Sequence, residues 1–393
     1  MSFNKRFNAE RYMLKSFRKK NCFDKWRLVT KAISSSTEEE CLFFFDFLVL
    51  NQSVSPDSGV IGRKNPTVAD ESYIQYALTG SEIEKKYIKL DSEIPSYAMV
   101  SVCKLGNLNK HVNNYFKCNS LNIGKDSFII TFGKDSETEC TFADDYSVGS
   151  VFVNNKMLVD KPEYLSNTGY FKWNLKFEKL EEPKNGYLSG LNNWNIVSGK
   201  VNCEGSIDCD GETFIVEPRN SFAYINKDWG RVYQNPLFHL SSNNFISQIT
   251  GQRLTNSYFA VQGVYNDSLS VLLHLEGEDY YYMAKRNNKN ELKFDVSESK
   301  SDEDSALLHW SISLFYKKYV LDIDIFCPTN KLHLRDYECT YGESDLMEVL
   351  SGNGYGEIKF YHQNKKTLEL IEHIRVVSCL CEYGNIQGLE SEE

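Results

Sequence analysis

A strict two-residue alternation of apolar and polar side chains recurs along this chain and constrains its fold more than any other feature. The clearest instance runs from Phe171 to Phe177, where Phe, Trp, Leu and Phe occupy every second position. Successive side chains of a β-strand point to opposite faces, so this period predicts a strand with one buried face and one solvent-exposed face. The same period at 308–314 and 321–325, on either side of Lys317, predicts a hairpin.

Short strands joined by short turns predict an all-β, antiparallel architecture. Aromatic residues make up 13% of the 393 residues, and such side chains suit a pleated, half-buried surface. Helical patterning is limited to the N-terminal arm and to 162–167 or 344–350. Strands are expected at 42–50, 97–103, 127–132, 148–153, 196–203, 212–217, 220–226, 257–265, 269–275, 279–284, 291–297, 308–314, 321–325, 356–361 and 371–379.

The charge distribution argues against a nucleic-acid partner. The net charge is −10, whereas affinity for phosphates requires clustered Lys and Arg. Residues 1–27 are the exception, with nine basic residues against two acidic ones. We interpret this basic N-terminal arm as a solvated terminal helix, the alternative being transient contact with an anionic membrane surface.

The sequence predicts a soluble, cytoplasmic protein without a metal. The N-terminus lacks the apolar core of a signal peptide, and the longest apolar run, Leu42 to Leu50, is interrupted by Asp46 and is too short to span a membrane. The eleven cysteines are expected to be reduced, since they show no zinc-site spacing. The seven histidines are scattered.

Three further segments have plain structural interpretations. Gly352-x-Gly354-x-Gly356 has the look of a phosphate loop, but strand-like residues follow it, which favours a hairpin turn. The acidic residues from Ser206 to Glu217 match a calcium-loop template poorly and are interpreted as a hairpin turn at Asp210-Gly211. Residues 51–95 are interpreted as a long excursion between early strands that could close over a pocket.

The segment from Asn220 to Phe245 carries the candidate chemistry. Tyr224, Asp228, Trp229 and His239 bring three titratable side chains and an indole within a short stretch of strand and turn. A Trp-Gly pair at a strand end also closes barrels structurally, so this alternative stays open.

Ala223-Tyr-Ile-Asn-Lys-Asp-Trp-Gly230 resembles the Tyr-Ala-x-Lys-Asn-Trp-Gly segment of the tocopherol cyclase-like family, which is related in fold to the carotenoid 1,2-hydratases. The hairpin at 199–216 and the segments at 95–100 and 241–244 extend the likeness. The resemblance implies two packed lipocalin-like antiparallel β-barrels with a short N-terminal helix. The implied division is 1–27 arm, 28–218 first barrel, 219–388 second barrel and 389–393 acidic tail.

The resemblance implies a cofactor-independent cyclase or hydratase that protonates an alkene of a lipophilic, isoprenoid- or polyketide-like substrate. Such chemistry needs a proton donor in a dry pocket and aromatic faces that steady a cation. The expected catalytic residues are Asp228, Tyr224 and His239, and the expected substrate-binding residues are Trp229, Phe222, Asn226, Ser241 and Asn243. Asp228 stands where cyclase relatives carry Asn, and Leu237 and His239 stand where many relatives place aromatics.

Two alternatives from other classes stay open. A carrier would bind a lipophilic ligand in the same barrel cavity without chemistry. A structural protein would use the basic arm to dock on a partner. The depth at which Asp228 lies in an apolar pocket distinguishes the enzyme from the carrier.

Overall fold

A computed structural model gives the arrangement of the chain. It describes residues 11–14, 21–52, 95–124, 128–160, 165–181, 187–188, 191–265, 267–285, 291–300, 306–340, 346–365 and 367–386. Most of the basic N-terminal arm, most of the segment 51–95 and the acidic tail lie outside these residues.

The first sheet has 13 antiparallel strands in the order β4-β3-β2-β1-β12-β11-β9-β8-β7-β6-β5, with β10 paired to β11 and β13 paired to both β1 and β11. Its strands are Phe23–Ser34 (β1), Glu40–Leu50 (β2), Tyr97–Leu105 (β3), Lys110–Phe116 (β4), Asn122–Ile123 (β5), Ile129–Phe132 (β6), Cys140–Ala143 (β7), Tyr146–Val153 (β8), Gly169–Glu181 (β9), Tyr187–Leu188 (β10), Asn192–Cys209 (β11), Glu212–Val216 (β12) and Ala223–Gly230 (β13).

The second sheet has 10 strands in the order β17-β16-β15-β14-β23-β22-β20-β19-β18, with β21 paired to β22. Its strands are Leu237–Ser247 (β14), Tyr258–Val264 (β15), Ser268–Leu275 (β16), Glu278–Lys285 (β17), Leu292–Lys300 (β18), Ala306–Tyr316 (β19), Tyr319–Pro328 (β20), His333–Glu338 (β21), Leu346–Asn364 (β22) and Thr367–Ile386 (β23).

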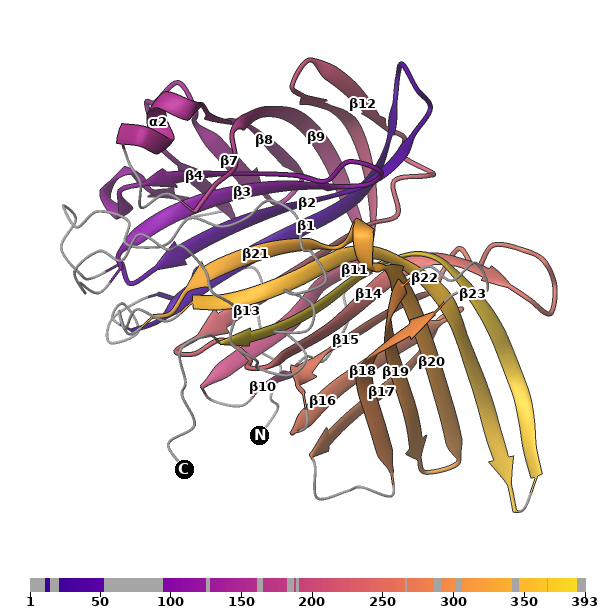
Figure 1. The fold of residues 1–393 in the computed structure, drawn as a ribbon. Coiled ribbons are helices and arrows are strands. Elements are labelled where there is room, and N and C mark those ends of the chain that lie inside the picture. Colours follow the sequence, from indigo (N-terminus) through magenta and orange to yellow (C-terminus); the bar gives the residue numbers. More distant parts are fainter. Residues whose placement is uncertain are drawn as a thin grey trace.

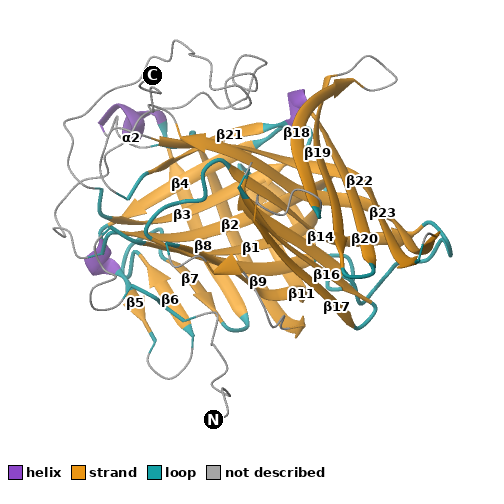
Figure 2. Cartoon of the chain, turned by 90° about the horizontal axis from the view of Figure 1, so that it is seen from below, coloured by secondary structure: helices purple, strands orange, loops and turns teal. Residues whose placement is uncertain are grey.

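Each sheet curls around an apolar core of its own, and the two curled sheets lie against each other (Figures 1 and 2). This packing explains the alternation from Phe171 to Phe177. Its four apolar side chains enter the first core, while the intervening side chains are exposed. Trp310 and Ile323 enter the second core in the same way. Strands β19 and β20 form the hairpin expected around Lys317.

The all-β prediction is confirmed, because two antiparallel sheets account for nearly all described regular structure. Among the described residues, helix is limited to Asn155–Asp160 (α2) and the short 3₁₀ turns Cys118–Ser120 and Thr329–Lys331. Within the described part of the chain, no helix has the length and apolar character needed to cross a membrane.

Three sequence-based expectations are wrong. The arm was expected to be helical to residue 27, but β1 begins at Phe23, since this segment supplies a central strand paired along its length with β2. The helix expected at 344–350 is excluded, because β22 begins at Leu346. The turn expected at 352–356 lies inside β22, where the absence of a Cβ at Gly354 and Gly356 lets the strand approach β20 closely.

The chain passes from the first sheet to the second between Gly230 and Leu237. The division inferred near residue 219 therefore lies one strand earlier than this change, because β13 pairs with β1 and β11 rather than with the strands that follow it. The turn expected at Asp210-Gly211 does connect β11 to β12.

Candidate functional site

The two sheets meet along a buried layer that contains most of the predicted site residues. We call this layer the seam. Strands whose two faces are both covered, such as β1, β2, β13 and β14, present one face to their own core and the other to the seam. Its polar side chains include Lys25, Arg27, Asp46, Tyr224, Asn226 and Asp228 from the first sheet and His239, Ser241, Gln262, Arg335, Tyr337, Ser351 and Glu382 from the second.

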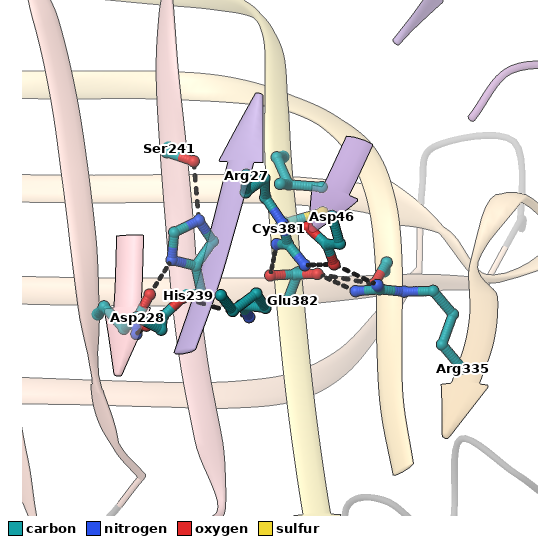
Figure 3. Close-up of polar contacts among 12 residues, drawn as sticks. Arg27, Asp46, Asp228, His239, Ser241, Arg335, Cys381 and Glu382 are labelled. Carbon is teal, nitrogen blue, oxygen red and sulfur yellow. Dashed lines mark hydrogen bonds and ion pairs between the residues drawn. The ribbon is translucent and has the colours of Figure 1, made fainter. Parts of the chain in front are cut away.

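Two arginines and two carboxylates form the centre of the seam (Figure 3). Arg27 binds Asp46 through Nε at 2.5 Å and Nη2 at 2.7 Å, and its Nη1 donates to Glu382 Oε2 at 2.6 Å. Arg335 contacts the same two carboxylates from the second sheet, and Tyr337 Oη donates to Asp46 Oδ2 at 2.9 Å. This pairing satisfies charges that would otherwise be costly to bury.

The electrostatics of this network fix its protonation state. The adjacent guanidinium groups of Arg27 and Arg335 outweigh the effect of burial and lower the pKa of Glu382 to about 2. The same neighbours hold the pKa of Asp46 well below its usual value. Both carboxylates are therefore charged at neutral pH.

A second chain of hydrogen bonds runs through the seam beside this network. Tyr224 Oη lies 2.7 Å from Ser241 Oγ, and Ser241 Oγ lies 2.8 Å from His239 Nε2. His239 Nδ1 lies 2.9 Å from Gln262 Oε1. Gln262 Nε2 donates to Asp228 Oδ1 at 2.5 Å, and Lys25 Nζ lies 3.2 Å from Asp228 Oδ2.

The donors in this chain follow from its charged end. The Asp228 carboxylate accepts from Gln262 Nε2, so Gln262 Oε1 is left to accept from His239 Nδ1. His239 Nε2 is then the unprotonated nitrogen and accepts from the Ser241 hydroxyl. This order gives an imidazole lone pair directed at two linked hydroxyl groups.

Burial determines the proton affinities of this chain. His239 is buried, and desolvation lowers its pKa to about 4. Desolvation also raises the pKa of Tyr224 well above its usual value. At neutral pH the imidazole is uncharged and can accept a proton, while the phenol keeps its own.

A pocket of about 390 Å³ lies at one end of the seam, and we call it the mouth pocket. It is lined by Leu180, Lys200, Val201, Asn202, Pro218, Arg219, Ser221, Phe222, Asn243, Phe245, Arg253, Leu254 and Thr255. The pairing of β11 with β13 shifts register near Ser198, and that of β14 with β23 shifts near Asn244. Bulges bend strands away from their partners, so these two irregularities explain why the sheets separate here.

The mouth pocket adjoins the hydrogen-bonded chain along β14. Asn243 lines the pocket, and Ser241 lies two residues further into the seam, a step of about 7 Å along a strand. Asn243 Nδ2 donates to the carbonyls of Gly199 and Ala223 at 3.1 and 2.9 Å. Its Oδ1 is buried and has no hydrogen-bond partner within the described part of the chain.

Like Asn243 Oδ1, two more buried polar atoms in the seam lack a hydrogen-bond partner among the described residues. These atoms are Trp194 Nε1 and Asn226 Oδ1. The Trp194 ring lies edge-on to the His239 ring, with the two centroids 6.3 Å apart. Leaving such groups unpaired costs about 1–3 kcal/mol each. The indole N–H of Trp194 is thus an available donor on a ring that contacts the imidazole.

The structure places most, but not all, of the predicted site residues together. Tyr224, Asn226 and Asp228 occupy the seam face of β13 opposite His239 and Ser241. Asn243 and Phe222 line the mouth pocket, although Phe222 precedes β13 with φ +45° and so breaks the expected alternation. These residues lie between the sheets and not inside a barrel, because the seam face of β13 points away from the first core.

Trp229 and Lys227 point from the opposite face of β13, away from the seam. Lys227 Nζ lies 4.2 Å from the Trp26 ring centroid, 5.7 Å from that of Trp229 and 3.0 Å from Asp24 Oδ1. Asp24 also accepts from the backbone N–H of Met13 at 2.6 Å. Burial outweighs the attraction of Lys227 and raises the pKa of Asp24 to about 6.

Sequence reasoning missed the charged centre of the seam and the Asp24–Lys227 pair. One signal was present, since Asp46 interrupts the apolar run of β2 and a charge there must find a buried partner. Nothing local identifies Arg335 and Glu382 as those partners. Among the residues that the structure describes, no group of three or more His, Cys, Asp or Glu side chains is arranged to hold a metal ion.

Comparisons with known proteins give similarities in structure only. No family model and no curated protein matches the sequence. An AttH-type protein from Nitrosomonas europaea has 8% identity over 92% of each chain, with a TM-score of 0.47. Kievitone hydratase from Nectria haematococca has 8% identity over 92% of this chain and 88% of its own, with a TM-score of 0.42. Similarities of this degree do not transfer an activity.

Proposed function

We propose that this protein is a cofactor-independent hydratase or cyclase that adds an O–H bond across a double bond of a lipophilic substrate. The observation that carries the proposal is the hydrogen-bonded chain from Tyr224 through Ser241 to the neutral imidazole of His239, beside a pocket with apolar walls. A site of this kind places proton-transfer groups next to a pocket that can hold an apolar substrate.

The chemistry follows from what such an addition requires. The attacking oxygen, of water in a hydratase or of a substrate hydroxyl in a cyclase, loses one proton, and a carbon of the double bond gains one. Ser241 passes the first proton to His239 Nε2, and the Tyr224 hydroxyl gives its proton to carbon. The imidazolium then returns its proton through Ser241 to the oxygen of Tyr224, which restores the starting state. The proton count balances without an oxidant or a reductant.

In this proposal Asp228 orients the imidazole and does not act as the acid expected from the sequence. Lys25 Nζ at 3.2 Å and the Gln262 N–H at 2.5 Å both stabilise a carboxylate. A carboxylate at the end of the chain holds Gln262 in the orientation that keeps the proton on His239 Nδ1. Asp228 is accordingly a positioning residue.

The proposal is tested with isoprenoid alkenes in D₂O without added cofactor. Farnesol and geranylgeraniol serve as probes, and mass spectrometry detects the solvent deuterium that enters a new C–D bond on hydration or cyclisation. His239→Gln should lower the rate by ~10²–10⁴-fold, the range typical of a lost acid–base group. His362→Gln, on β22 outside the seam, should leave the rate unchanged.

Two outcomes would overturn the proposal. Binding of the alkenes without deuterium uptake would identify a carrier. Deuterium uptake that His239→Gln leaves intact would remove the imidazole from the mechanism.

A further inference from the structure

The mouth pocket has a charge opposite to that of the protein. Lys200, Arg219 and Arg253 line it, and none of its lining residues is acidic, although the chain carries a net charge of −10. A concave site lined by one sign of charge attracts ligands of the opposite sign. The pocket therefore favours an anionic group.

The two arginines are available to such a group. Neither Arg219 nor Arg253 forms an ion pair with any residue in the described ranges. Arg253 Nη1 donates to the side-chain oxygen of Asn220 at 3.2 Å, and its guanidinium lies 5.3 Å from the Phe222 ring centroid. These contacts orient the guanidinium without neutralising it. Lys200 differs, because Glu181 lies opposite it in the ladder between β9 and β11.

The rest of the pocket is suited to an apolar body. Leu180, Val201, Phe222, Phe245 and Leu254 contribute its apolar side chains. Its volume of about 390 Å³ lies within the range of about 300–1,000 Å³ found for small-molecule sites. A ligand that satisfies both features has an anionic head and a hydrocarbon chain.

We propose that the mouth pocket binds an amphiphilic carboxylate, whose head group pairs with Arg219 and Arg253 and whose hydrocarbon chain lies against the apolar wall. A planar guanidinium matches a carboxylate with two parallel hydrogen bonds. The inference deepens the proposed function by naming the substrate class, and it rests on that function for the role of the site. Binding itself does not depend on turnover.

The test compares two twelve-carbon probes on the full chain by isothermal titration calorimetry at low ionic strength. Dodecanoate should bind at least tenfold more tightly than dodecanol, and added salt should weaken only the dodecanoate. The double substitution R219Q/R253Q should abolish this preference while dodecanol binding persists, which also shows that the variant is folded. Arg231→Gln, an exposed arginine outside the pocket, should change neither affinity.

Equal affinity for the two probes would overturn the inference, as would a preference for dodecanoate that survives R219Q/R253Q. His239→Gln separates the two proposals. If the hydratase or cyclase proposal is wrong, wild type and His239→Gln both still prefer dodecanoate. If the carboxylate proposal is wrong, the deuterium uptake of wild type and its loss in His239→Gln are unaffected.

Discussion

Arg27 on β1 donates a 2.6 Å hydrogen bond to Glu382 on β23, so a buried ion pair joins the first strand of one sheet to the last strand of the other. The two residues are 355 positions apart. Arg335 and Ser351 contact the same carboxylate, which makes Glu382 a junction within the seam. The packing of the sheets therefore depends on charges that are matched only when both sheets are folded.

Removing the charge of Glu382 should destabilise the protein strongly. Glu382→Gln leaves two buried guanidinium groups with one carboxylate, and breaking a buried pair typically costs about 3–5 kcal/mol. Glu357→Gln, which removes a half-exposed carboxylate paired with Lys359, should cost less than about 1 kcal/mol. Urea denaturation at pH 7 measures both free energies of unfolding. Equal losses in the two variants would contradict a structural role for the seam network.

The lowered pKa of Glu382 sets an acid limit to stability. Its pKa falls from 4.5 to about 2 on folding, so its stabilisation is complete above pH 4.5 and is lost as the pH falls toward 2. A shift of this size corresponds to about 3 kcal/mol. Unfolding free energies measured from pH 6 to pH 2 should decline less steeply in Glu382→Gln than in wild type. Parallel curves would show that the carboxylate has an ordinary pKa.

Asp24 should titrate near pH 6, because folding raises its pKa, whereas it lowers that of Glu382. Because folding raises its pKa, the folded state binds this proton more tightly than the unfolded state does, and its contribution to stability falls as the pH rises from about 4 to about 6. Carbon-13 NMR of the aspartate carboxyls should show one resonance with a midpoint near 6. Asp24→Asn should remove that resonance, and a midpoint near 4 would contradict the buried environment.

Gly199 should tolerate no side chain, because the two sheets approach each other there. A Cβ at this position of β11 would lie 2.3 Å from Cε2 of Tyr258 on β15. Gly199→Ala should therefore cost about 1–3 kcal/mol, the range for overpacked sites. In the Tyr258→Ala background the same substitution should cost much less. An equal cost in both backgrounds, measured by thermal unfolding, would place the strain elsewhere.

Some of the site was accessible from the sequence and some was not. The segment from Tyr224 to Asn243 was identified because its polar side chains are concentrated locally. The contacts of Asp228 could not be foreseen, because Lys25 and Gln262 reach it from other strands. The mouth pocket depends on register shifts, which the two-residue period cannot reveal.

The formation of antiparallel sheet could be predicted from the sequence alone. Alternation such as that from Phe171 to Phe177 is a local property, since each side chain faces opposite to its neighbour whatever the strand pairs with. The covering of both faces of β1, β2, β13 and β14 follows from the packing of the two sheets, as do the contacts of Arg27 with Asp46 and Glu382. Strand order and register bring together residues hundreds of positions apart, and a buried charge acquires its partner and its pKa from that arrangement.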